Sequence, residues 1–206
     1  MTEDSAVVRR LPAERRRELI LQAARAVILA KGLPATSVRE IATAAGVSSG
    51  TVTHHFASID EILAAVLRAE TERVRGELWA EASARSSALD ALVALGQGLL
   101  SQRREVREYW SLWMDFWARA THDRELARWQ SERYRTWREL IRGFVAAGIE
   151  AGEFRDVDPD EAAVDIVALI DGLGIQAFFE LGHITPTAAR RRLAAGIGER
   201  LAPPEG

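Results

Sequence analysis

A short segment near the N-terminus, from Ser49 to His55, carries small polar side chains whose spacing suits the major groove of DNA. On a helix, Val52 of this segment points to the same side as Phe56, which follows it, and the other side chains point outward. Hydroxyl and imidazole groups can donate to and accept from the edges of bases. The outward set consists of Ser49, Gly50, Thr51, Thr53 and His54. These residues predict contact with double-stranded DNA.

Two short helices and the turn between them are needed to hold this surface. Before the segment, four apolar residues recur at helical intervals and predict one buried stripe: Val38, Ile41, Ala42 and Ala45. Gly46 can take the left-handed conformation that ends a helix, and Val47 can fill the corner. Ser48 is a good N-cap for the second helix. The pattern predicts a helix-turn-helix.

Two capping boxes support these boundaries independently of the apolar pattern. Ser37 with Glu40, and Ser58 with Glu61, each have the S-x-x-E spacing that marks a helix start. By spacing alone, the element is either a DNA-reading motif or a packing unit of an all-helical protein.

The run from Ile41 to Leu63, IATAAGVSSGTVTHHFASIDEIL, resembles the DNA-binding domain of the tetracycline-repressor (TetR) family, in which IA-x-x-AGVS-x-G-x-x-x-x-HF-x-S-x-x-x-LL is common. The matching residues are Ile41, Ala42, Ala45, Gly46, Val47, Ser48, Gly50, His55, Phe56, Ser58 and Leu63. The resemblance implies a dimeric, two-domain, all-helical transcriptional regulator, with a DNA-binding domain at 1–58 and an effector-binding and dimerisation domain at 59–206.

Two positions depart from the family pattern. Thr53 stands where the family often has tyrosine, and Ile59 where it often has lysine. Both usual residues are candidates for phosphate contacts, so their absence predicts weaker and less salt-dependent operator binding.

The expected DNA contacts divide into base readout and backbone positioning. Base readout is assigned mainly to Ser49, Thr51, Thr53 and His54, and positioning to Thr36, Ser37, Arg39, Ser48 and the arginines of the first helix. The full set is Thr36, Ser37, Arg39, Ser48, Ser49, Gly50, Thr51, Thr53, His54 and His55, of which His55 is expected to pack at the rear of the reading helix.

Charge is unevenly divided along a chain whose net charge is −3. Residues 1–60 contain eight Lys or Arg against six Asp or Glu, whereas the remainder contains nineteen against twenty-four. This asymmetry fits a DNA-binding end and a body that does not bind DNA. Arg9, Arg10 and Arg15 to Arg17 form a basic cluster that either meets the phosphate backbone or is a solvated face.

The 206 residues are 48% hydrophobic and can bury a substantial core, and none is cysteine, which excludes disulfides and thiol chemistry. The charged N-terminus does not resemble a signal peptide, and no apolar run is long enough to cross a bilayer. We expect a cytoplasmic protein without membrane contact.

The rest of the chain predicts helices throughout, so the expected fold class is all-α: an N-terminal three-helix domain and a larger C-terminal helical domain for ligand binding and dimerisation. Apolar periodicity and end signals place the longer helices near 13–31, 59–82, 87–101, 104–120, 124–151, 159–181 and 186–201.

The body concentrates indole rings, with five tryptophans between Trp110 and Trp137. Such a stripe is either ordinary core or the lining of a pocket. Indole faces attract ammonium groups by about 1 to 2 kcal/mol per desolvated contact, so a pocket would favour a cationic or flat aromatic effector. The candidate pocket consists of Trp110, Trp113, Phe116, Trp117, Tyr134, Trp137, Asp171 and Gln176. Asp115 is a further acidic candidate that either meets solvent or reaches a neighbouring wall.

The segment from Trp113 to Phe179 also resembles, more loosely, the C-terminal domain of the choline-responsive BetI-type branch. The likeness rests on the paired tryptophans, the G-x-x-x-G-E-F turn at Gly148 to Phe154 and the DGL-x-x-Q run at Asp171 to Gln176.

Two reading heads are needed to read enough base pairs, which predicts a homodimer on a palindromic operator. The last two helices are the expected interface, although their apolar faces would equally suit an intramolecular core. The expected residues are Val167, Ile170, Leu173, Gly174, Ala177, Phe178, Leu193, Ile197 and Leu201.

An enzyme is not expected, because no catalytic motif is present. Adjacent His54 and His55 diverge on a helix and make a poor metal site, and no cofactor is implied. We therefore predict a DNA-binding regulator, and most simply a repressor that a small effector releases from DNA. The alternative is a helical ligand-binding or scaffold protein with a degenerate reading head.

Overall fold

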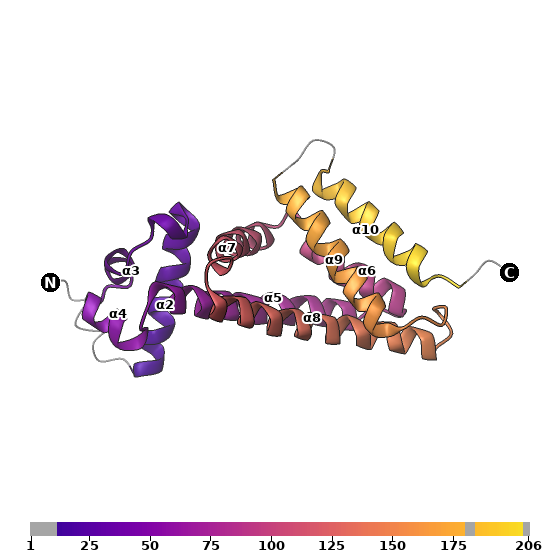
Figure 1. The fold of residues 1–206 in the computed structure, drawn as a ribbon, viewed down its shortest axis with the longest axis horizontal. Helices are drawn as coiled ribbons and strands as arrows, with labels where there is room; N and C mark the ends of the chain where they lie inside the picture. Colours follow the sequence, from indigo (N-terminus) through magenta and orange to yellow (C-terminus); the bar gives the residue numbers. More distant parts are fainter. Residues whose placement is uncertain (1–11, 180–183, 204–206) are drawn as a thin grey trace. The chain divides into compact units, whose positions relative to one another are not determined.

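The computed structural model describes residues 12–179 and 184–203, and within them the chain forms α-helices and one 3-10 turn but no strand (Figure 1). The elements are α2 (Ala13–Lys31), η1 (Leu33–Ala35), α3 (Val38–Ala44), α4 (Ser49–His55), α5 (Ile59–Ser83), α6 (Ala88–Leu99), α7 (Arg104–Ala120), α8 (Arg124–Glu150), α9 (Pro159–Phe178) and α10 (Pro186–Leu201). The all-α prediction is confirmed. The arginines at positions 9 and 10 lie outside the described residues.

The helices divide into two compact units. The first unit contains residues up to Glu72 together with Ser111–His122, and the second contains Arg73–Trp110 and the chain from Asp123 onward. The division therefore passes through α5 and α7, each of which contributes residues to both units. The sequence placed a domain boundary at residue 58. Packing extends the first unit further along α5, because Ile62, Leu63 and Leu67 are fully buried.

In the first unit, α2 packs against α3, and α3 against α4. Their shared core is apolar and fully buried, and includes Ile20, Ala24, Ile28, Ile41, Ala42, Val52 and Phe56. Burying large aliphatic or aromatic side chains of this kind stabilises a fold by about 1.5 to 3 kcal/mol each. The short helices α3 and α4, each of seven residues, are therefore held by packing rather than by helix propensity.

The ends of the short helices follow the capping chemistry expected from the sequence. Ser37 accepts a hydrogen bond from the Glu40 amide, and the Glu40 carboxylate accepts one from the Ser37 amide, which completes the capping box. Gly46 has φ of 67° and redirects the chain between α3 and α4. Before α5, the Ser58 hydroxyl accepts from the Glu61 amide, whereas Glu61 reaches the amide of Ala57 rather than that of Ser58.

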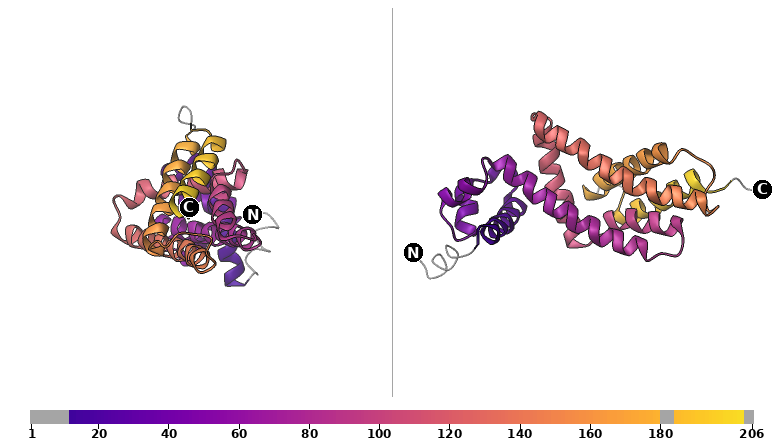
Figure 2. Two further views of the ribbon diagram at one scale, coloured as in Figure 1. Left: turned by 90° about the vertical axis from the view of Figure 1, so that its right-hand side faces the viewer. Right: turned by 90° about the horizontal axis from the view of Figure 1, so that it is seen from below.

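In the second unit, α9 packs between α8 and α10, and α6 contacts both α8 and α10. Figure 2 shows these four helices from two further directions. Their interior is aliphatic and includes Leu92, Leu95, Ile141, Val145, Ile166, Ile170, Leu193 and Ile197. The turn after α8 is closed by Gly152, with φ of 73°, and by Phe154, whose ring lies where a side chain on Gly148 would be.

A tryptophan and a glycine fit tightly together in this unit. Trp110 lies in the part of α7 that belongs to the second unit. Its ring lies over Gly174 of α9, so that a methyl group on Gly174 would overlap the indole. The indole N–H donates to the Leu99 carbonyl at 2.8 Å. Gly174 thus makes room for Trp110 of the same chain.

We predict that Gly174→Ala destabilises the second unit by about 1 to 3 kcal/mol, because the added methyl displaces a well-packed ring. Gly143→Ala is the matched control, on α8 of the same unit. No described atom outside its own helix lies within 4 Å of a methyl group there, so this change should be neutral or stabilising by up to about 1 kcal/mol. Denaturant unfolding of both variants measures the difference, and equal stabilities would contradict the packing described.

Candidate DNA-reading and effector sites

Helix α4 presents the polar surface that the sequence predicted. Val52 and Phe56 are buried, while Ser49, Gly50, Thr53 and His54 are exposed and Thr51 is half-buried. The apolar pair packs inward against α2 and α3, so the polar positions on the opposite side of this two-turn helix face solvent. The exposed hydroxyl and imidazole groups are available to base edges.

Some of these hydroxyls are already engaged within the helix. The hydroxyls of Ser48 and Thr51 lie 2.9 Å apart, and Ser48 also caps the Thr51 amide at 3.1 Å. The Thr53 hydroxyl donates to the Gly50 carbonyl at 3.2 Å, which leaves its lone pairs outward. Ser48 and Thr51 therefore mainly define the start of the helix, whereas the side chains of Ser49 and His54 make no hydrogen bond within the described residues.

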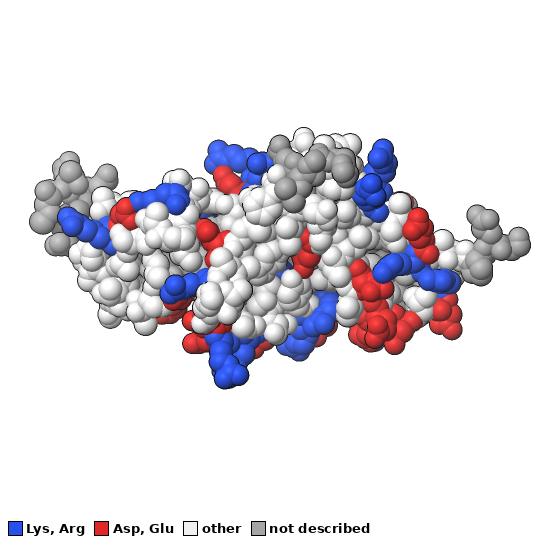
Figure 3. All heavy atoms as spheres, turned by 45° about the horizontal axis from the view of Figure 1, so that its top comes forward, with Lys and Arg blue, Asp and Glu red and all other residues white. Residues whose placement is uncertain are grey.

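The reading helix has no arginine, lysine or carboxylate of its own. Positive charge has to come from neighbouring elements, where Arg39 of α3 and Arg15 of α2 are exposed, the latter paired with Glu18. The Arg17 guanidinium lies over the Phe56 ring at 4.8 Å and so links α2 to the end of α4. In the second unit, arginines and carboxylates alternate on the face drawn in Figure 3, with carboxylates gathered towards one end. This mixed face offers no continuous positive surface to a phosphate backbone.

The two histidines at the end of α4 differ in environment, as expected from their divergence. His54 is exposed, and its ring meets that of His55 edge-on with centroids 5.5 Å apart. The Nε2 atom of His55 is buried without a hydrogen-bond partner among the described residues. Burial of the ring is the main cause that lowers the pKa of His55, and the charges of His54, Arg16 and Arg17 lower it further. His55 is therefore neutral near pH 7.

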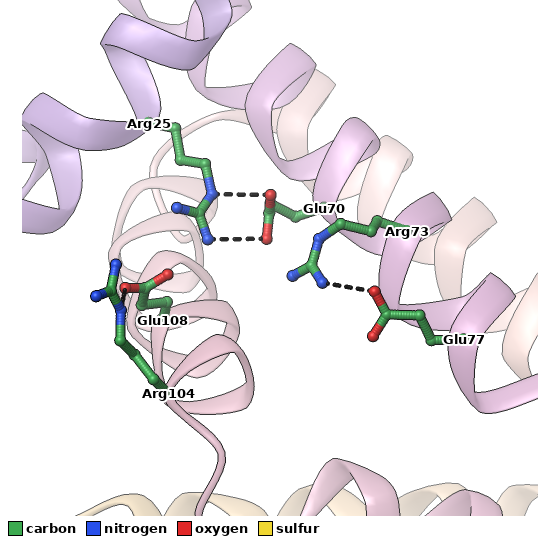
Figure 4. A network of polar contacts seen from close by, with 6 residues as sticks. All are labelled: Arg25, Glu70, Arg73, Glu77, Arg104 and Glu108. Carbon is green, nitrogen blue, oxygen red and sulfur yellow. Dashed lines mark hydrogen bonds and ion pairs between the residues drawn. The ribbon is translucent and has the colours of Figure 1, made fainter. Parts of the chain in front are cut away.

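One charged contact in the first unit was not foreseen from the sequence. Glu70 of α5 is 6% exposed, and both of its oxygens accept from the Arg25 guanidinium of α2, at 2.8 and 3.3 Å (Figure 4). Breaking a buried pair by removing one partner typically costs about 3 to 5 kcal/mol. In the sequence, the only indication of this contact is that Glu70 is an acidic residue within an apolar helical stripe.

The residues proposed to line an effector pocket divide between the two units. Trp113, Phe116 and Trp117 of α7 belong to the first unit, where Trp113 and Phe116 are buried and their rings meet edge-on at 5.2 Å. The second unit holds Trp110, Tyr134, Trp137, Asp171 and Gln176. The aromatic stripe is therefore partly ordinary core within each unit.

Tyr134 of α8 and Asp171 of α9 are brought together in the second unit. The phenol donates to the Asp171 carboxylate at 2.6 Å. Burial, followed by the bond to Asp171, raises the pKa of Tyr134 to about 12. Burial also raises the pKa of Asp171, against the lowering effects of Tyr134 and of the Arg133 charge. The Asp171 carboxylate thus lies beside an aromatic ring that the Arg133 guanidinium also approaches, at 4.6 Å from the ring centroid.

Trp137 lies one helical turn after Tyr134 on the same helix. Its side chain is 4% exposed, and its indole N–H has no hydrogen-bond partner among the described residues. Trp110 is instead satisfied by Leu99, and the cavity beside it, about 20 Å³, is the size of a water molecule. Gln176 is exposed and donates to the Gly172 carbonyl of its own helix. Tyr134, Trp137 and Asp171 are the members of the predicted set that combine aromatic side chains with a carboxylate within the second unit, and the ligand contacts of the whole set stay a prediction.

Most of the residues expected at the dimer interface are buried within a single chain. Seven of the nine are buried: Ile170, Leu173, Gly174, Ala177, Leu193, Ile197 and Leu201. Leu193 contacts α6 near Gly96, and Gly174 receives Trp110. Only Val167 and Phe178 are half-exposed. The buried seven therefore form intramolecular core, and any dimer surface on these helices needs their other faces.

The described residues contain no group of three His, Asp or Glu side chains placed to hold a metal ion. None of the helices in the described ranges has both the length and the apolar character needed to span a bilayer.

A capped, seven-residue reading helix on a three-helix unit, followed by a larger helical unit, defines a helix-turn-helix regulator. Residues 20–66 match the model of the bacterial regulatory proteins of the tetR family, and residues 88–202 match that of the BetI-type transcriptional repressor C-terminal domain. The chain belongs to the TetR family, with a C-terminal domain of the BetI type. It is thus a DNA-binding transcriptional regulator with a ligand-binding C-terminal domain.

Individual relatives cover almost the whole chain. The transcriptional regulator BetI of Cronobacter sakazakii is 30% identical over 194 residues, which is 91% of each chain. BetI of Burkholderia ambifaria is 28% identical over 181 residues, or 85% of this chain and 89% of its own. A transcriptional regulator from Saccharomonospora viridis, solved in complex with choline, is 29% identical with a TM-score of 0.82, and the match covers 92% of this chain and 99% of that one. These relatives are regulators rather than enzymes.

We predict that His55 makes the stability of the first unit depend on pH. Its pKa is lowered in the folded state, so the unfolded chain binds the proton more readily. The contribution is fully present above about pH 6.5, the ordinary pKa of histidine, and is lost as the pH falls through the lower folded value. Unfolding free energies measured between pH 8 and 5 should decline less for His55→Gln than for the native protein.

His54→Gln is the control for this prediction. His54 is exposed, and its charge is a smaller cause of the lowered His55 pKa than burial, so its replacement should leave most of the decline with pH in place. A His55→Gln variant with the native pH dependence would show that His55 is solvated.

Proposed function

We propose that this regulator is a repressor that binds a palindromic operator as a homodimer and leaves it when a small organic cation binds the second unit. The observation that supports DNA reading most directly is the outward polar face of α4, held in place by buried Val52 and Phe56. One such helix reads only a few base pairs, so a second copy related by two-fold symmetry supplies the other half-site. A repressor of this kind works in the cytoplasm, where the DNA is.

The proposed dimer surface is the exposed side of α9. Val164 is 43% exposed and Phe179, which follows the helix, is 54% exposed. Between them on the same side lie Ala168 and Gly172, both exposed, and among the described residues no atom outside α9 lies within 4 Å of a methyl group on Gly172. Small residues flanked by large apolar ones permit two helices to approach closely. This surface replaces the buried set predicted from the sequence.

The proposed effector is a quaternary ammonium ion, with choline as the first to test. The S. viridis regulator, 29% identical, was solved in complex with choline, and the BetI-type domain model covers residues 88–202 of this chain. In the second unit, Asp171 offers a half-buried carboxylate that is bonded to Tyr134. One face of the Tyr134 ring already carries the Arg133 guanidinium, 4.6 Å from the centroid, and Trp137 offers a buried indole one turn further along α8. Aromatic faces with a nearby carboxylate are the chemistry that recognises such cations.

Selection from random duplex DNA by the purified protein at moderate salt tests the reading function. We expect enrichment of a palindrome whose half-sites are separated by about one helical turn of DNA. Weak binding that depends on salt but enriches no sequence would contradict the proposal. It would indicate that Thr53 and Ile59 prevent sequence-specific binding.

We predict that His54→Ala reduces discrimination between the selected operator and random DNA by about 1 to 3 kcal/mol, because an exposed imidazole on the reading helix contacts a base. Titrations of both DNAs measure it. Equal losses on the two DNAs would assign His54 to the phosphate backbone instead. Thr43→Ala is the control, since Thr43 is exposed on α3 and its hydroxyl donates to the Arg39 carbonyl.

We predict that choline weakens operator binding by the native protein about 5- to 150-fold, the usual range of allosteric coupling, and that Asp171→Asn lacks this response while it still binds the operator. Because burial raises the pKa of Asp171, its carboxylate is protonated at a higher pH than an exposed one, and the response should weaken as the pH falls.

Asp165→Asn is the matched control for the effector experiment. Asp165 lies on the same helix, but it is exposed and pairs with Arg200 at 2.9 Å. Its replacement should leave the response intact. Loss of the response in both variants, or no release of DNA by choline from the native protein, would contradict the proposed effector site.

A further inference from the structure

The second half of α7 belongs to the DNA-reading unit. Residues Ser111–His122 pack with the N-terminal helices, and Leu112, Trp113 and Phe116 of this stretch are fully buried. Asp115 lies among these residues but is half-exposed. The sequence left open whether Asp115 meets solvent, reaches a neighbouring wall or joins an effector pocket.

The Asp115 side chain reaches the turn that precedes the helix-turn-helix. The Leu33 amide, at the start of η1, donates to the Asp115 carboxylate at 2.9 Å across 82 residues of sequence. The first amides of a helical turn have no partner within it, and Gly32, the residue before η1, has no side chain to supply one. Asp115 therefore provides, from another helix, the cap that the local sequence lacks.

Gly32 lets the chain turn towards this carboxylate. Its φ is 79°, which side chains other than glycine rarely accept, and a methyl group on Gly32 would lie 3.9 Å from both Asp115 oxygens. The Gly32 carbonyl accepts from the Thr36 hydroxyl at 2.8 Å. Thr36 and Ser37 follow directly, and Ser37 caps α3. The Leu33 amide thus sets the position of two residues expected to contact phosphates.

A second contact joins α7 to the far end of the same motif. Arg119, one turn after Asp115, donates from two guanidinium nitrogens to the two carboxylate oxygens of Asp60, both at 2.8 Å. Asp60 lies in the first turn of α5, which follows the reading helix and is capped by Ser58. Residues four apart lie on one face of a helix. One face of α7 therefore holds the chain both before α3 and after α4.

We propose that Asp115 is a positioning residue for DNA binding: by capping the Leu33 amide from α7, it sets where Thr36, Ser37 and the start of α3 stand relative to the reading helix. The proposal rests on the DNA-binding function. It assigns Asp115 to the reading unit and not to an effector site.

Two substitutions separate this role from general stability. Asp115→Ala removes the cap, while Asp115→Asn keeps an oxygen that can accept from the same amide without the charge. Hydrogen bonds to charged groups are typically worth more than neutral ones. We expect the selected operator to bind about tenfold more weakly to Asp115→Ala and about threefold more weakly to Asp115→Asn. The Leu33 amide should exchange its hydrogen faster in the same order.

Asp123→Ala is the matched control. Asp123 is also a carboxylate cap, accepting from the Glu125 and Leu126 amides, but it lies at the start of α8 in the second unit. Its removal should lower stability and leave operator affinity and Leu33 exchange unchanged. If circular dichroism shows that Asp115→Ala does not fold, Asp115→Asn decides by the same two measurements.

Native operator affinity in the folded Asp115 variants, despite faster exchange at Leu33, would overturn the positioning role. So would weaker binding with native exchange at Leu33. If the native protein itself selects no operator, the DNA-binding proposal fails first, and that result is obtained before any variant is made.

Discussion

The direction in which α4 faces depends on the burial of Val52 and Phe56. Both side chains lie in the core formed with α2 and α3, and because a helix of seven residues has only two turns, this pair leaves a single orientation for the other positions. The small polar residues are then exposed together. Removal of either apolar side chain would reduce the packing energy and also change the orientation of the polar face of α4. Stability and DNA recognition therefore depend on the same contacts.

Neutral side chains on the reading helix have an electrostatic consequence. Affinity for DNA comes largely from cations that meet phosphates, whereas sequence is read at base edges. In this protein the two tasks lie on different elements, since α4 has no Lys, Arg, Asp or Glu and the arginines lie on α2 and α3. Correct placement of α2, η1 and α3 relative to α4 therefore matters for binding. Polar contacts from α5 and α7 hold these elements, including Glu70 on Arg25 and Asp115 on Leu33.

In the second unit, a half-buried polar pair lies in the contact between α8 and α9, which also carries the exposed ion pair of Arg142 with Asp160. Tyr134 and Asp171 satisfy each other in part, but burial raises the pKa of both groups. A well-packed aliphatic pair would stabilise such a contact at no desolvation cost. The Arg133 guanidinium, 4.6 Å from the Tyr134 ring centroid, supplies positive charge beside this pair, and the proposed cationic effector would supply more.

Local interactions explain what the sequence determined by itself. The helix ends at Gly32 and Gly46, the Ser37 capping box and the bounds of α2, α4, α7 and α10 follow from residues within about four positions of each other, and all agree with the structure. Only the tertiary structure decided where distant side chains meet: Leu33 with Asp115, Tyr134 with Asp171, and Trp110 with Gly174. For the same reason the apolar faces of α9 and α10 were assigned to a dimer, since periodicity shows that a face is buried but not which chain buries it.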